Sequence, residues 1–172
     1  MKRFKWHFLF ILSAAGLLFA CIKQEHYPDV PQIEYLDFIT VFDTGKYAVR
    51  GSLSISFTDG NGDIGLSTRD TFPPFNPGGQ YYYNYVLTFF NKVNGVFEQV
   101  DLDPPFSARI PVLNPDYPGK AIKGIIVYDT INLAMVPHPG YDTIRFEAFI
   151  YDRAKNKSNV ISTPEIILKK PY

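Results

Sequence analysis

A short acidic loop in the first half of the chain carries side chains that could bind a metal ion. Asp59, Asn61 and Asp63 alternate with two glycines in the stretch SFTDGNGDIGLSTRD, residues 56–70. Oxygen-bearing side chains at every second position, on a backbone that glycine lets curve tightly, can wrap a hard cation such as Ca²⁺. With Asp70 as a further oxygen ligand, the pattern predicts a calcium site made of these four residues.

The spacing resembles the first half of an EF-hand-type calcium loop. Counted from Asp59, Asp70 falls at the twelfth position, where such loops carry a bidentate carboxylate, and Ile64 stands at the sixth, where they carry glycine. A second interpretation stays open, because Asp-Gly and Asn-Gly are also the preferred residues of tight turns. A solvated turn without an ion accounts for the same residues.

A run of tyrosines, QYYYNY at residues 80–85, is the best candidate for a binding face. Strand alternation would place Tyr81, Tyr83 and Tyr85 on one side, where their rings and hydroxyls suit sugars or protein partners. The alternative is that one set of alternate residues lines the core and the other covers a sheet.

The N-terminus has the organisation of an export signal. Lys2, Arg3 and Lys5 precede an apolar run, residues 8–20, which is shorter than the roughly 20 residues that a spanning helix needs. A basic start, a short apolar core and a small residue at the end indicate a secretory signal peptide. The small residue is Ala20, and Cys21, the single cysteine, follows it.

Leu18, Ala20 and Cys21 resemble the lipobox of bacterial lipoproteins, with Phe19 at a position that is usually small. The resemblance implies that the Cys21 thiol is acylated and that the chain is cut just before it. It also implies a membrane partner through the acyl anchor. The resulting division is a signal peptide at 1–20, a polar tether at 21–32 and one domain at 33–172. One cysteine allows no internal disulfide, so packing must stabilise the domain.

Composition limits the function classes. The chain has 17 basic and 17 acidic residues, and removal of residues 1–20 would leave a net charge of −3. A mildly acidic protein is a poor partner for nucleic acid, which attracts basic patches. No nucleophile elbow, zinc-protease motif or phosphate loop occurs, and Asp101 with Asp103 fits the end of a strand better than an acid–base pair. The sequence therefore predicts a protein without catalytic activity.

The elements that must position these residues are strands. Alternation is clearest at 47–57, where Leu53, Ile55 and Phe57 face one way and three serines face the other. Other runs rich in β-branched and aromatic residues are separated by turn residues, which predicts an all-β sandwich. These runs are residues 33–42, 80–90, 96–102, 107–113, 121–133, 143–152 and 160–168.

The C-terminal stretch FEAFIYDRAKNKSNVIST, residues 146–163, resembles the last hairpin of bacterial immunoglobulin-like and fibronectin-III-like domains. The residues that carry the resemblance are Asp152, Ala154, Asn156 and Ser158. It implies an immunoglobulin-like β-sandwich, a fold that hosts many functions.

Two tripeptides, Asp129-Thr130-Ile131 and Asp142-Thr143-Ile144, resemble the O-glycosylation acceptor of Bacteroidetes. Together with the lipobox they indicate a Bacteroidetes-type lipoprotein of the outer membrane, on its periplasmic or its surface face. We expect a non-catalytic binding or envelope-structural module, whose partners are envelope proteins or glycans. The alternative is a surface accessory protein that captures glycans. Calcium is the one cofactor that the sequence suggests.

Overall fold

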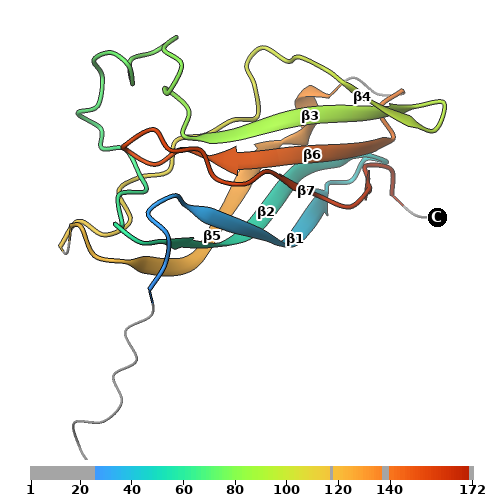
Figure 1. Cartoon of the computed structure of the whole chain (residues 1–172). Coiled ribbons are helices and arrows are strands. Elements are labelled where there is room, and N and C mark those ends of the chain that lie inside the picture. The colour runs from blue at the N-terminus through green and yellow to red at the C-terminus, as the bar shows by residue number, and fades with distance from the viewer. Residues whose placement is uncertain (1–25, 117, 137–139, 171–172) are drawn as a thin grey trace, which may run out of the picture.

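In a computed structural model of the chain, the described residues are 26–116, 118–136 and 140–170 (Figure 1). This part of the chain forms eight strands and one short 3-10 helix. The elements are β1 (Gln32–Phe42), β2 (Ala48–Asp59), β3 (Tyr85–Val93), β4 (Val96–Gln99), β5 (Ile122–Asn132), η1 (Leu133–Met135), β6 (Thr143–Ile150), β7 (Ile161–Ser162) and β8 (Ile166–Ile167).

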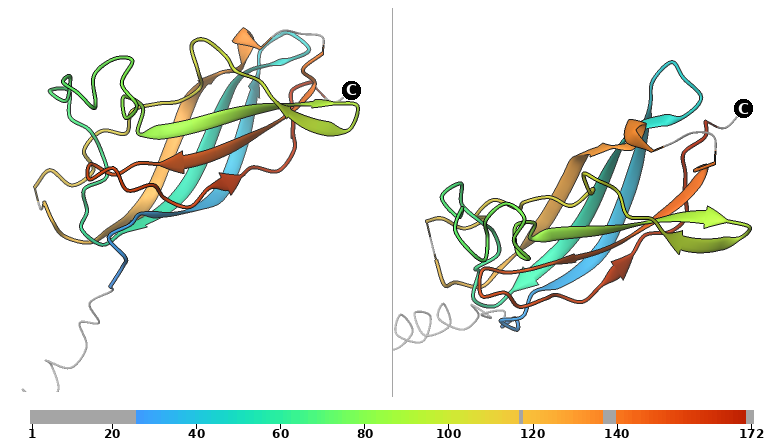
Figure 2. Two further views of the ribbon diagram at one scale, coloured as in Figure 1. Left: turned by 45° about the horizontal axis from the view of Figure 1, so that its top comes forward. Right: turned by 90° about the horizontal axis from the view of Figure 1, so that it is seen from above.

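The strands form two antiparallel sheets. The first has the order β1-β2-β5, and the second has the order β4-β3-β6-β7, with β8 also paired to β6. Figure 2 shows that the strands of the first sheet cross obliquely against β3 and β6. The predicted all-β class is therefore confirmed.

The core lies between the two sheets and follows from the two-residue period of their strands. In β2, Leu53, Ile55 and Phe57 are buried and the intervening serines are partly exposed, as the alternation predicts. The rings of Phe38 on β1 and Phe146 on β6 stack with centroids 5.6 Å apart. This contact joins the two sheets, because each ring comes from a different one.

Two predicted strands differ from the structure. The strand expected at 80–90 begins only at Tyr85, because the backbone N–H groups of Tyr81 and Tyr82 donate to Pro74 and Gly79 in turns. The strand expected at 107–113 is reduced to one bridge, in which Ala108 pairs with Tyr85. At 160–168, β7 and β8 stand on either side of Pro164, which has no N–H to donate to a ladder.

The chain enters the fold at the end where the acidic loop lies. Gln32 of β1 pairs with Thr58 of β2, and the Gly60 N–H donates to the Pro28 carbonyl oxygen at 2.8 Å. The sequence placed the start of the domain at residue 33. In the structure the chain already contacts the domain at Pro28. We call this end of the domain the entry end, and it includes segments 59–84 and 151–160.

Candidate functional site

Three aspartates come together at the entry end. Asp59 is the last residue of β2, Asp63 follows it within a tight loop, and Asp152 follows β6. Asp59 is 0% exposed and Asp152 is 1% exposed. The loop is fastened to the turn after β6, because Arg153 N–H donates to the Asp63 carbonyl oxygen at 3.1 Å. Each carboxylate is thus positioned by a strand end or by a main-chain bond between segments.

The carboxylates of Asp59 and Asp63 each have one hydrogen-bonded and one free oxygen. Asp59 Oδ2 accepts from Ile64 N–H at 3.3 Å, and Asp63 Oδ2 accepts from Ala154 N–H at 3.1 Å. Within the described part of the chain, Asp59 Oδ1 and Asp63 Oδ1 are buried and have no hydrogen-bond partner. Such atoms are rare in folded proteins and call for an explanation.

Ionisation of all three aspartates at once is electrostatically unfavourable. Burial, then the charges of Asp63 and Asp152, raise the pKa of Asp59 to about 6, although N–H groups of the loop oppose the rise. Burial and the Asp152 charge likewise raise the pKa of Asp63, with the Ala154 N–H and the Arg153 charge acting against them. Among the described residues, burial and repulsion between the carboxylates thus outweigh the N–H groups and the Arg153 charge in setting both pKa values.

Asp70 pairs with Arg153 and is not part of the cluster of Asp59, Asp63 and Asp152. The four predicted ligands are therefore not brought together. Its two oxygens accept from the Arg153 guanidinium, each at 2.7 Å, and Oδ2 also accepts from Ser67 N–H. The hydrogen bonds from Arg153 lower the pKa of Asp70 to about 2. A carboxylate held on both oxygens by a cation is not available to an ion. Nothing in the sequence indicates that Asp152, and not Asp70, lies beside Asp59 and Asp63.

The plain-turn interpretation explains only part of the loop. Asn61 Oδ1 accepts from Asp63 N–H at 3.3 Å, and Gly62 has a φ of 65° with the Lys120 carbonyl oxygen too close for a side chain. Asn61 and Gly62 are therefore turn residues. The complete burial of the Asp59 carboxylate is not something that a solvated turn requires.

The predicted tyrosine face is not present as one face. Tyr85 is 1% exposed and its ring lies in the core, so it cannot serve as a surface contact. Tyr81 and Tyr83 are half-buried and precede β3. Tyr81 packs against Tyr151 with centroids 4.9 Å apart. The prediction failed because the chain turns at residues 79–82 instead of continuing as a strand.

Arg109 organises the segment that carries these tyrosines. Its guanidinium donates to four carbonyl oxygens, those of Ser67, Asp70, Phe75 and Tyr82, at 2.7–3.4 Å. It also lies over the Tyr82 ring, 4.9 Å from the centroid. One side chain therefore fixes the path of residues 67–82, and no pattern in the sequence indicates this role.

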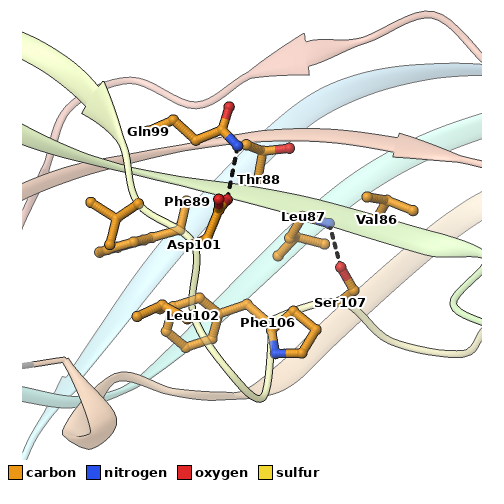
Figure 3. Close-up of a pocket in the computed structure, with 11 residues that line it drawn as sticks. Val86, Leu87, Thr88, Phe89, Gln99, Asp101, Leu102, Phe106 and Ser107 are labelled. Atoms are coloured by element: carbon orange, nitrogen blue, oxygen red, sulfur yellow. Dashed lines mark hydrogen bonds between the residues drawn. The ribbon is translucent and has the colours of Figure 1, made fainter. Parts of the chain in front are cut away.

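A pocket of about 230 Å³ lies between β3 and the segment that follows β4 (Figure 3). Asp101 is the one ionisable residue among those that line it, and its Oδ1 accepts from Gln99 Nε2 at 3.0 Å. Ser107 Oγ accepts from Leu87 N–H. The serine thus helps to join its segment to β3.

Cys21 and the predicted signal lie outside the described residues. Among the residues that the structure covers, no helix is long and apolar enough to cross a membrane. Comparison of the chain with protein-family models, curated proteins and solved structures finds no match.

Proposed function

We propose that this protein is an exported lipoprotein whose immunoglobulin-like β-sandwich acts as a non-catalytic binding or structural module of the cell envelope. The observation that carries the proposal is the basic, apolar and small-residue pattern that ends at Ala20 and Cys21. Acyl chains on Cys21 would hold the protein firmly, since each buried methylene contributes about 0.8 kcal/mol.

The fold fits such an anchor because the chain reaches the domain early. Gly60 already bonds to Pro28, so the span between the anchor and the domain is at most residues 22–27. Six extended residues reach at most about 20 Å. The proposal therefore places the entry end close to the lipid surface.

The turn after β6 supports the immunoglobulin-like assignment. Asp152 accepts from the Asn156 N–H and from Asn156 Nδ2, each at 2.7 Å, while Lys155 has a φ of 74°. Ser158 Oγ accepts from Ile150 N–H at 3.0 Å. The residues that carry the sequence resemblance are thus the ones that form this turn.

The anchor is tested by mass spectrometry of the protein purified from its native membrane. We expect a chain that begins at Cys21 and carries acyl groups, and we expect Cys21→Ser to abolish both processing and acylation. An unmodified thiol, or an uncut chain that starts at Met1, would overturn the proposal.

A second candidate function is capture of glycans at the entry end. Phe75, Tyr81, Tyr151 and Phe149 form a run of rings in which neighbouring centroids lie 4.9–6.3 Å apart. Aromatic surfaces with hydroxyl groups suit sugar rings. Retention on polysaccharide columns tests it: Tyr81→Ala should reduce retention and Phe97→Ala, on β4, should not. Equal retention of both variants and the native protein would exclude this surface.

A further inference from the structure

We propose that Asp59 and Asp63 bind one divalent cation, Ca²⁺, at the entry end, and that Asp152 supplies a third negative charge beside it. The sequence predicted Asp59, Asn61, Asp63 and Asp70 as ligands. Asn61 and Asp70 are left out here, because Asn61 is a turn residue and Asp70 pairs with Arg153, and Asp152 is added as a nearby charge. The proposal concerns the folded domain and holds whether or not Cys21 is acylated.

The first support is the orientation of two carboxylates. In each, Oδ2 is occupied by a backbone N–H, from Ile64 for Asp59 and from Ala154 for Asp63. Each Oδ1 is buried without a partner within the described residues, although Asp59 is 0% exposed. Both side chains are therefore fixed with one oxygen free, which is the preorganisation that a cation ligand needs.

The second support is the charge balance around them. Asp59, Asp63 and Asp152 lie within electrostatic range of one another. Arg153 is the cation beside them, and its guanidinium already pairs with Asp70. Buried charges are normally paired or bound to metal. The hydrogen bonds that Asp59 and Asp63 accept within the described residues come from main-chain N–H groups.

The chemistry of the donors selects the ion. Carboxylate oxygens suit hard cations, whereas Zn²⁺ sites are built largely from Cys and His. Among the described residues, no three His, Cys, Asp or Glu side chains converge as a metal centre, so carbonyl oxygens and water must complete the shell. Ca²⁺ accepts such mixed and irregular shells, whereas Mg²⁺ demands near-octahedral geometry.

The expected affinity is modest. Extracellular calcium modules bind with dissociation constants of about 10⁻⁴–10⁻³ M. For a constant of about 0.5 mM, 5 mM Ca²⁺ multiplies the folding equilibrium constant by about 11. The melting temperature should then rise by about 3–5 °C for a domain of this size.

The test is thermal unfolding of the full chain, purified in mild detergent and stripped with EDTA, with and without 5 mM CaCl₂. We expect the rise in the native protein, no rise in Asp59→Asn or Asp63→Asn, and a smaller rise with MgCl₂. Asp70→Asn is the matched control: it should melt at a lower temperature and keep the full calcium response.

Binding itself is measured separately by Tb³⁺ luminescence, which nearby tyrosines sensitise, with circular dichroism to show that each variant is folded. Displacement of Tb³⁺ by Ca²⁺ should occur in the native protein and in Asp70→Asn. The proposal is overturned if the native protein shows neither shift nor displacement. It is also overturned if folded Asp59→Asn responds as the native protein does, or if Asp70→Asn alone loses the response.

Discussion

The segment between β2 and β3 contains two acidic regions with opposite electrostatics. In the first, Asp59 and Asp152 are buried, Asp63 is partly buried beside them, and the pKa of Asp59 rises to about 6. In the second, Asp70 meets the Arg153 guanidinium through two bonds of 2.7 Å, and its pKa falls to about 2. The two regions are separated by only seven positions in the sequence, from Asp63 to Asp70.

The difference between them arises from where the cations lie. Arg153 comes from the turn after β6 and Arg109 from the segment before β5, and both hold residues 67–82. Within the described residues, the side chains of Asp59 and Asp63 accept hydrogen bonds from main-chain N–H groups. The carboxylate of the second region is therefore paired with a cation of the chain, whereas the free oxygens of the first region are where a proton or the proposed ion would bind.

The largest expected effect is the pH dependence of stability in EDTA. The folded pKa of Asp59, about 6, exceeds its ordinary value of 3.8, so its favourable contribution is present below pH 4 and is lost as pH rises through 6. Two pKa units correspond to about 3 kcal/mol. The groups that set this pKa are Asp63 and Asp152, with Arg153 acting on Asp63.

Melting curves from pH 4.5 to 7.5 measure this loss. The native protein should melt at a lower temperature as pH rises, while Asp59→Asn should be flatter and more stable at pH 7.5. A native melting temperature that rises over the same range in EDTA would show that the two regions do not differ as described.

Arg109→Met should have the next largest effect, because it dismantles the second region. The substitution removes four hydrogen bonds to carbonyl oxygens and the contact with Tyr82. We expect a loss of about 2 kcal/mol, since water replaces part of what the guanidinium supplied. Urea unfolding measures it, with Arg69→Met, an exposed neighbour, as the control. An equal effect of both variants would remove Arg109 from its organising role.

Asp70→Asn should cost less, about 1 kcal/mol or below. The Arg153 side chain is 47% exposed, so solvent screens the pair. The contribution of Asp70 exists above its ordinary pKa of 3.8 and is lost as pH falls through 2, opposite in sign to Asp59. Native and variant proteins should therefore converge in stability near pH 2, and a constant difference down to that pH would contradict the pairing.

Tyr85→Phe should have the smallest effect. It tests whether burial of an unpaired polar atom is costly when that atom carries no charge. The Tyr85 hydroxyl is buried and has no hydrogen-bond partner among the described residues, as with Asp59 Oδ1, but it is neutral. Loss of a neutral unpaired group should change the free energy of unfolding by less than about 0.5 kcal/mol. A large gain in the free energy of unfolding would show that an unpaired neutral group is also costly here, and a large loss would show that the hydroxyl makes a favourable contact.

The strands were the most predictable part of the molecule. Leu53, Ile55 and Phe57 face the core because period-2 alternation determines which face is buried. The strand predicted at 80–90 was wrong at its start because turns after Pro74 and Gly79 use the N–H groups of Tyr81 and Tyr82. Strand propensity within residues 80–90 cannot reveal these turns, because the accepting carbonyl groups of Pro74 and Gly79 lie outside that run.

The site was predictable only where its residues are close in sequence. Asp59 and Asp63 were identified from their spacing, whereas Asp152 lies 89 positions after Asp63 and reaches it through the strand order. Asp70 was assigned by counting along a loop, but Arg153, brought in by the turn after β6, decides its role. Sequence spacing cannot reveal a partner that tertiary structure supplies.

The most direct test of the difference between the two regions is a ¹³C NMR titration of the aspartate carboxyl carbons in the full chain. In EDTA we expect the Asp59 signal to titrate near pH 6 and the Asp70 signal near pH 2. We expect 5 mM Ca²⁺ to lower the Asp59 midpoint by about one pH unit, which corresponds to the roughly 11-fold effect expected on the folding equilibrium. An Asp59 midpoint below pH 4 in EDTA would contradict the account.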